Sequence, residues 1–247
     1  MIKKVLKRIL IASLLLIVVG YGIFAMGYFS KLPNSTVCNE IVVELTDVSE
    51  NMLITKERVY NQVVNSEYNP LGRHSDSINT EKIEAYIEKN KIVKDATAYF
   101  TSSGKLKIKV AQRIPLYKIM GEGGNFFVDR DGVMIPAQSV FAVKLPIVSG
   151  YVEKEFAANE LRKFVLYLQK NQFWGQQIEQ IYIKANGDVE LIPKVGNHRI
   201  VVGTLTDVDK KLNRLMKFYL SGLNEVGWNR YAVINLKYDK QIVCTKR

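Results

Sequence analysis

The sequence predicts an α+β protein made of an N-terminal transmembrane helix, a small β-α-α-β-β domain and a larger antiparallel-sheet β domain with flanking helices. Three observations lead to this fold class. Residues 9–29 carry no charged side chain. Residues 38–115 show strand, helix, helix, strand and strand patterns in that order. Residues 116–247 are dominated by short alternating strands that turn residues separate.

The apolar N-terminal segment predicts a single membrane span. It has 21 residues, about the number that a helix needs to cross roughly 30 Å of hydrocarbon. The tip before it, residues 1–8, holds four basic residues and no acidic one. The positive-inside rule therefore places the tip in the cytoplasm and the chain from about Ser30 onward outside. A cleaved signal peptide is the alternative, but its apolar core is usually only ~7–15 residues long.

The formal net charge of +11 does not indicate a nucleic-acid-binding protein. Lysine and arginine are spread through the chain and interleaved with aspartate and glutamate. The sequence has no basic run with aromatic residues at stacking spacing, which would favour nucleic acid. The outer part keeps +7 after the four charges of the tip are subtracted from +11. A basic face near an anionic membrane or wall polymer fits this balance.

The small domain is predicted element by element. "NEIVVELTDV" (39–48) is a strand, and two helices follow with Thr55 and Asn79 as their N-caps. Two further strands, 92–101 and 105–110, are joined by a Ser-Ser-Gly turn, which is typical of a hairpin. In the last strand lysines alternate with apolar residues, which predicts one face against the helices and one face toward solvent.

The larger domain is predicted to begin with two short strands around the turn Asp129–Gly132. This D-x-D-G stretch resembles half of a calcium loop, but Gln138 stands where the loop needs a glutamate, so a turn is the better interpretation. Asn186 and Gly187 are typical of a hairpin turn. The remaining elements are a helix over 153–170, strands over 178–193, a strand near 198–204, a helix from Asp207, and final strands over 230–238 and 241–247.

The two cysteines, Cys38 and Cys244, both lie in the outer part of the chain. An oxidising compartment permits a disulfide that would join the start of the folded region to its end. Two unpaired thiols within strands are the alternative, and we favour it because cysteine often behaves as a small buried apolar residue.

A catalytic site is not visible in the sequence. His74 and His198 stand outside any H-E-x-x-H pattern, and G-x-S-x-G and S-x-x-K are missing. The glycines at 121, 123 and 124 are not followed by a helix, so they do not form a phosphate loop. We therefore expect no enzymatic activity, no cofactor and no metal ion. A membrane-attached wall hydrolase, which would need a converging carboxylate pair, is a remote alternative.

The chain resembles the FtsQ/DivIB family of bacterial cell-division proteins over essentially its whole length. The motifs that carry the resemblance are the strand ending in Arg113-Ile-Pro115, "FFVDRDGVMIP" (126–136), "LPIVSG" (145–150) and "INLKYDKQIVC" (234–244). The resemblance implies a POTRA domain over 38–115 and a family-type β domain over 116–247. Arg113 is then expected to be a structural residue of the junction, where Pro115 ends the strand because it cannot donate a ladder hydrogen bond.

The resemblance implies a non-enzymatic scaffold of the division machinery at the septum, in the cytoplasmic (inner) membrane with its folded domains in the periplasm. Such a scaffold links upstream and downstream division proteins and helps to regulate septal peptidoglycan synthesis. Its implied partners are the membrane proteins FtsB and FtsL and other divisome proteins. FtsB would add a strand at the C-terminal edge. The matching residues are Lys237, Tyr238, Asp239, Lys240, Gln241, Ile242, Val243 and Cys244.

The sequence departs from the family pattern at individual positions. Tyr238 is the expected interface residue, although it could instead contact only its own core. Lys240 and Gln241 stand where the family often has a small residue, and Lys246 stands where some members have an aromatic one. The second POTRA strand, around Asp95–Phe100, is implied to contact upstream proteins. A POTRA-containing secretion or transport accessory protein of the envelope is the alternative function.

Overall fold

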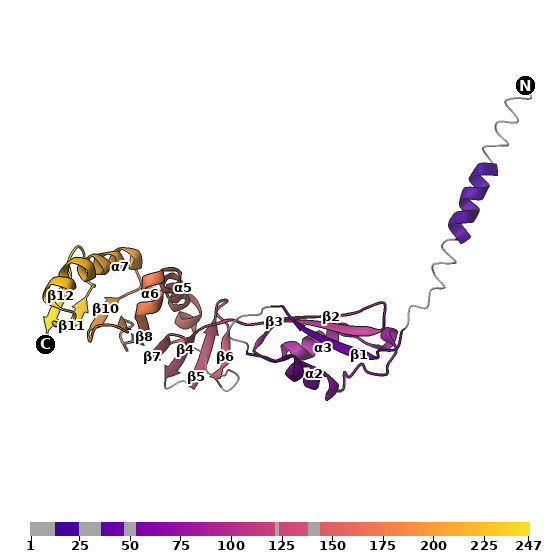
Figure 1. Cartoon of the computed structure of the whole chain (residues 1–247), viewed down its shortest axis with the longest axis horizontal. Coiled ribbons are helices and arrows are strands. Elements are labelled where there is room, and N and C mark those ends of the chain that lie inside the picture. The colour runs from indigo at the N-terminus through magenta and orange to yellow at the C-terminus, as the bar shows by residue number, and fades with distance from the viewer. Residues whose placement is uncertain (1–12, 25–35, 47–52, 122–123, 138–143) are drawn as a thin grey trace, which may run out of the picture.

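The computed structural model describes residues 13–24, 36–46, 53–121, 124–137 and 144–247. Residues 13–24 form a helix, and the rest of the predicted span over 9–29 lies outside the described residues, as does the tip 1–8. Within the described part of the chain, no helix has both the length and the apolar character that crossing a membrane requires. The folded region has two sheets, which we call the first and the second domain (Figure 1).

The first domain is a three-stranded sheet with two helices on one face, as predicted (Figure 1). The sheet order is β1-β3-β2, with β1 parallel and β2 antiparallel to β3. Both predicted caps are confirmed, because Thr55 accepts the Arg58 N–H at 3.2 Å and Asn79 accepts the Lys82 N–H at 2.9 Å. The elements are β1 Glu40–Leu45, α2 Lys56–Val64, a 3₁₀ turn Ser75–Ser77, α3 Thr80–Glu88, β2 Val93–Phe100 and β3 Lys105–Gln112.

The alternation predicted for β3 is confirmed. Leu106, Ile108 and Val110 are fully buried in the core between the sheet and the helices. The lysines between them cover the other face, where Lys105 and Lys107 make ion pairs of 2.6 and 2.7 Å with glutamates of β1. One strand thus separates a dry face from a charged one.

The second domain is a nine-stranded sheet in the order β12-β11-β10-β9-β8-β7-β4-β5-β6. Its strands are β4 Pro115–Gly121, β5 Gly124–Asp129, β6 Met134–Pro136, β7 Ile147–Gly150, β8 Ile178–Ile183, β9 Val189–Pro193, β10 Arg199–Gly203, β11 Tyr231–Asn235 and β12 Val243–Lys246. Its helical segments are α4 Lys154–Phe156, a π-helical turn Ala157–Leu161, α5 Arg162–Lys170, α6 Gln172–Gln177, α7 Val208–Lys217, a π-helical turn Phe218–Leu223 and α8 Asn224–Val226.

The prediction of an antiparallel sheet is wrong for the second domain, because the sheet is mixed. Strand β7 runs parallel to both β4 and β8, and β10 runs parallel to β11. The connections from β7 to β8 and from β10 to β11 contain helices. A helical crossover returns the chain to the same end of the sheet, so the next strand must be parallel. The five other neighbouring pairs are antiparallel.

Side-chain contacts hold the junction between the two domains. They confirm the structural role that the sequence predicts for Arg113 there. The Arg113 guanidinium lies 3.0 Å from a carboxylate oxygen of Asp129, which is almost completely buried. The other oxygen of Asp129 accepts the backbone N–H groups of Asp131 and Val133 at 2.9 and 2.7 Å, which confirms the predicted turn. Lys94 of β2 reaches across to Asp131 at 2.8 Å. This turn holds the two domains together.

The first domain also covers part of the second sheet. Phe127 of β5 and Ile135 of β6 belong to the hydrophobic core of the first domain. The helices of the second domain cover the opposite face, where Ile181, Leu191 and Ile234 are fully buried. Strand β12 is at the opposite edge of the sheet from β6 and lies at the end of the molecule that is far from the first domain (Figure 1). Cys38 and Cys244 are both free thiols, as favoured from the sequence.

Candidate partner-binding site

Strand β12 is the outermost strand of the nine-stranded sheet and has β11 as its only neighbour in the described order. The pairing is antiparallel, with Asn235 opposite Val243, Ile234 opposite Cys244 and Val233 opposite Thr245. The register then shifts toward Tyr231, which marks a β-bulge. An edge strand presents a row of backbone donors and acceptors that another extended chain can use.

The free backbone groups of β12 follow from its hydrogen bonding. The Arg247 N–H donates to the Arg230 carbonyl at 3.4 Å, so it points toward β11. Because N–H groups of a strand alternate sides, those of Lys246 and Cys244 point away from the sheet. These two residues, two apart, offer the spacing that an added strand needs.

The turn that leads into β12 is held by Arg214 of α7. Its guanidinium donates to the carbonyl oxygens of Leu236 and Tyr238, both at 3.0 Å. It also lies 3.8 Å from the carboxylate of Asp239, which is exposed. Arg214 lies more than twenty residues before the turn, and an arginine on the polar face of a helix carries no sequence signal for this role. Sequence reasoning therefore missed it.

The predicted residue Lys237 is engaged within the chain. Its ammonium lies 2.7 Å from a carboxylate oxygen of Asp188, just beyond the Asn-Gly turn. This hydrogen bond lowers the pKa of Asp188 and raises the pKa of Lys237. The stem of Lys237 crosses Gly203, where an added Cβ would come within 2.7 Å of the lysine side chain. Lys237 thus fixes the start of the turn.

The other predicted residues separate into two groups. Tyr238 is 50% exposed and Val243 is 44% exposed, so both present apolar surface to solvent. Ile242 and Cys244 contact the core of their own domain instead. Lys240 adopts a left-handed backbone with φ of 57°, a conformation that glycine adopts most easily because it has no Cβ. Gln241 is exposed at the end of the turn.

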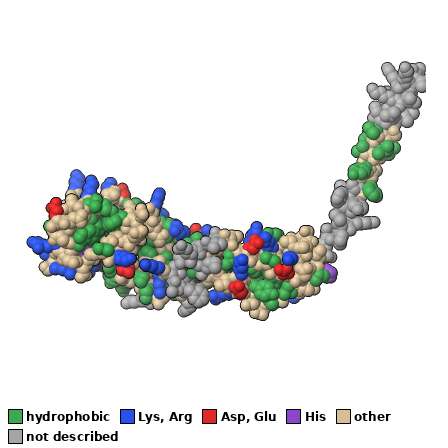
Figure 2. All heavy atoms as spheres, viewed as in Figure 1, with side chains coloured by type: hydrophobic (Ala, Val, Ile, Leu, Met, Phe, Trp, Pro, Cys, Tyr) green, Lys and Arg blue, Asp and Glu red, His purple; other side chains and the backbone are tan. Residues whose placement is uncertain are grey.

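The surroundings of β12 are basic. Lys240, Lys246 and Arg247 are all exposed, and Figure 2 shows blue side chains at the end of the second domain where the C-terminus lies. Arg247 also donates to the Asn197 carbonyl, which ties the chain end to the loop before β10. An approaching segment with acidic residues would be attracted to this end of the molecule.

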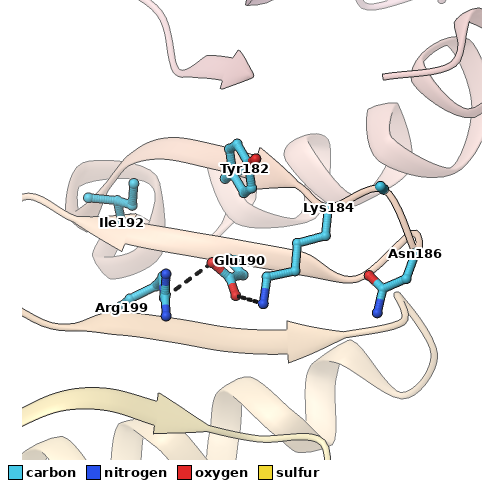
Figure 3. A pocket seen from close by; sticks show the side chains of 7 residues that line it. Tyr182, Lys184, Asn186, Glu190, Ile192 and Arg199 are labelled. Atoms are coloured by element: carbon cyan, nitrogen blue, oxygen red, sulfur yellow. Dashed lines mark ion pairs between the residues drawn. The ribbon is translucent and has the colours of Figure 1, made fainter. Parts of the chain in front are cut away.

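A hollow on the helix-free face of the sheet has a structural explanation. It is lined by residues of β8, β9 and β10 and of the turn between β8 and β9, and at its floor lies the buried Glu190 (Figure 3). The Lys184 ammonium lies 2.6 Å and the Arg199 guanidinium 3.2 Å from the two Glu190 oxygens. These cations neutralise the buried carboxylate. Among the described residues, no group of three or more His, Cys, Asp or Glu side chains is arranged to hold a metal ion.

Behind β10 and β11, an aromatic cluster supports the strands that carry the edge. The ring of His198 hydrogen-bonds the Tyr219 hydroxyl at 2.7 Å and lies beside Trp228. His198 is 4% exposed, and burial is the main cause that lowers the pKa of His198. Burial likewise raises the pKa of Tyr219. This histidine is thus buried among the aromatic side chains behind the sheet.

Comparison with known proteins defines the class. Residues 36–111 match the model of a POTRA-like domain, and residues 114–245 match the model described as FtsQ/DivIB, C-terminal related. The second match alone covers 132 of the 247 residues. The protein therefore combines a POTRA-like domain with the C-terminal domain typical of these cell-division proteins. The chain belongs to the FtsQ/DivIB family.

Two of the similar proteins carry the name of the cell-division protein DivIB. The chain is 22% identical over 208 residues to the cell division protein DivIB of Clostridium tetani (strain Massachusetts / E88), covering 79% of this chain and 76% of the relative. Among solved structures it matches the major extracytoplasmic domain of DivIB from Geobacillus stearothermophilus, in its trans isomer. That match has 13% identity and a TM-score of 0.31, covering 40% of this chain and 85% of the other.

Proposed function

We propose that this protein is a non-enzymatic scaffold of the division machinery that binds FtsB and FtsL by strand addition at β12. The observation that carries the proposal is an exposed edge strand whose approach turn is fixed by Arg214 and Lys237. Main-chain hydrogen bonds to Cys244 and Lys246 would supply affinity, and exposed Tyr238 and Val243 would supply selectivity.

The proposed scaffold has the arrangement expected from the sequence. Residues 1–8 form the cytoplasmic tip, 9–29 span the inner membrane, 38–115 form the POTRA domain and 116–247 the β domain, both periplasmic and at the septum. The basic tip and the apolar segment support this arrangement. The family of the chain supports the division role.

A proline substitution tests strand addition directly. Lys246→Pro removes an N–H that points away from β11, so the internal ladder is kept while the added strand loses a donor. Lys246→Ala keeps the N–H and is the matched control. We expect the proline variant of the full chain to bind the same organism's FtsB–FtsL pair about tenfold more weakly, the equivalent of one net hydrogen bond of roughly 1.4 kcal/mol, and the alanine variant to bind nearly as well as the parent.

A second pair of variants tests the selectivity contact. Tyr238→Ala should weaken binding, whereas Tyr151→Ala, which removes another exposed tyrosine far along the chain, should not. Equal binding by all four variants would place the interface elsewhere. A well-folded parent that does not bind FtsB–FtsL at all would instead favour the envelope transport or secretion accessory function.

A further inference from the structure

The edge of the first sheet at β2 is closed by two glutamates of α3. Ala98 donates its backbone N–H to a carboxylate oxygen of Glu84 at 2.7 Å, and Ala96 donates to Glu88 at 3.1 Å. The two glutamates are one helical turn apart, and the two alanines are two residues apart in the strand. Side chains of one helix therefore accept the hydrogen bonds of two successive outward N–H groups of one strand.

These two N–H groups are outward-facing donors of β2. The Thr101 N–H donates to the carbonyl of Lys105 in β3 at 2.9 Å. The N–H groups of Thr97 and Tyr99, which lie opposite Lys109 and Lys107, therefore point toward β3 as well. Because the N–H groups alternate sides along a strand, those of Ala96 and Ala98 point away from β3, toward the outside of the sheet. In the described order of this sheet, β2 is an outer strand.

Carboxylates at these positions have a consequence for partners. A strand that pairs with β2 must place its own carbonyl oxygens where the Glu84 and Glu88 oxygens lie. Hydrogen bonds from a backbone N–H to a charged acceptor are stronger than those to a neutral carbonyl. The glutamates therefore satisfy these two N–H groups of the edge strand and compete with any incoming strand for them.

The exposed edge would suit a second copy of β2. An antiparallel arrangement centred on Thr97 sets Ala96 of one copy opposite Ala98 of the other, so the N–H groups of these two alanines find carbonyl acceptors in two equivalent exchanges. The same arrangement sets Asp95 opposite Tyr99, so no like charges face each other directly. A sheet of three strands would then continue into a sheet of six.

We propose that Glu84 and Glu88 form a latch that closes the β2 edge, and that the unlatched edge pairs with β2 of a second copy of this chain. The latch keeps the first domain from associating through β2. This inference does not depend on which partner binds at β12.

The test compares three variants of the full chain in a mild non-ionic detergent. Glu84→Ala/Glu88→Ala removes both acceptors, and Glu84→Gln/Glu88→Gln keeps an amide oxygen that can still accept. Glu81→Ala removes an exposed glutamate of the same helix and is the matched control. Light scattering gives the oligomeric state, hydrogen exchange reports the amides of 96 and 98, and circular dichroism checks folding.

We expect the double alanine variant to dimerise and its Ala96 and Ala98 amides, measured at a dilution where it is monomeric, to exchange roughly tenfold faster than in the parent, because each loses a charge-assisted hydrogen bond. The parent, the glutamine variant and Glu81→Ala should stay monomeric. Adding Ala98→Pro to the double alanine variant should restore the monomer, because proline removes the outward donor and leaves the ladder to β3 intact.

Three results would overturn the proposal. Unchanged exchange at both amides would show that the carboxylates do not protect the edge. A monomeric double alanine variant with fast exchange would show that β2 does not pair with a second copy. A dimer that persists with Ala98→Pro would place the contact elsewhere. If the double alanine variant is unfolded, the single variants Glu84→Ala and Glu88→Ala give the same comparison for each glutamate separately.

Discussion

The guanidinium of Arg113 lies 3.0 Å from the Asp129 carboxylate, and this pair joins the end of the first sheet to the first hairpin of the second. Asp129 has only 2% of its side chain exposed and Arg113 has 19%. A buried carboxylate that keeps its charge needs a partner, and here the partner comes from the other side of the domain junction.

Removing the arginine should therefore destabilise the whole folded region. We expect Arg113→Ala to lower the free energy of unfolding by about 3 kcal/mol, because it leaves Asp129 buried without its counter-ion. Lys94→Ala breaks the exposed pair with Asp131 at the same junction and should change stability little. Urea unfolding followed by fluorescence measures both. Equal effects of the two variants would contradict the prediction.

The contact between Arg214 and the turn before β12 yields a second prediction. Arg214→Ala should lower the free energy of unfolding by about 2 kcal/mol, since two hydrogen bonds from a charged donor are lost. Hydrogen exchange should become faster in peptides that cover residues 236–242. Lys210→Ala, on the exposed side of the same helix, serves as the control. Unaltered exchange in the turn would show that Arg214 does not hold it.

Much of the first domain could be predicted from the sequence because local signals and packing agree there. Thr55 and Asn79 are caps in the sequence and in the structure, and the lysine alternation of β3 matches its two faces. The turn at Asp129–Gly132 in the second domain is likewise recognisable from its residues alone. Each of these signals acts within a few positions of the chain.

The parts that could not be predicted depend on contacts between distant residues. The mixed order of the second sheet follows from where its helices cross, which strand patterns do not encode. Arg214 of α7 reaches the turn before β12, and the glutamates of α3 reach β2 around the edge of the first sheet. The edge position of β12 came from the family resemblance, since an alternating strand looks the same at an edge and inside a sheet.

The left-handed backbone of Lys240 gives a third prediction. Only glycine adopts this conformation without a steric cost, and an L-residue pays about 1–2 kcal/mol for it. Allowing for the greater freedom of glycine in the unfolded chain, we expect Lys240→Gly to raise the free energy of unfolding by about 0.5–1 kcal/mol. Lys240→Ala removes the same side chain and should not stabilise. Thermal unfolding of both variants compares them, and a less stable glycine variant would argue against the strained turn.

The buried His198 makes stability depend on pH. Burial holds the pKa of His198 below its ordinary value of 6.5, and the nearby positive charge of Arg247 acts in the same direction. Well above pH 6.5 the imidazole is neutral in both the folded and the unfolded chain. As the pH falls below 6.5 the unfolded chain takes up a proton first, so the free energy of unfolding decreases until the folded pKa is reached.

This loss should appear in unfolding measurements between pH 7 and pH 5. Within the interval between the two pKa values, one histidine contributes a slope of up to about 1.4 kcal/mol per pH unit. His198→Gln keeps a polar side chain beside Tyr219 but does not titrate, so its stability should vary less with pH over this range. His74→Gln, at an exposed site, should keep the pH dependence of the parent. Parallel slopes for His198→Gln and the parent would mean that other groups cause the dependence, whereas the carboxylates with lowered pKa, such as Asp188 and Asp131, act only at more acidic pH.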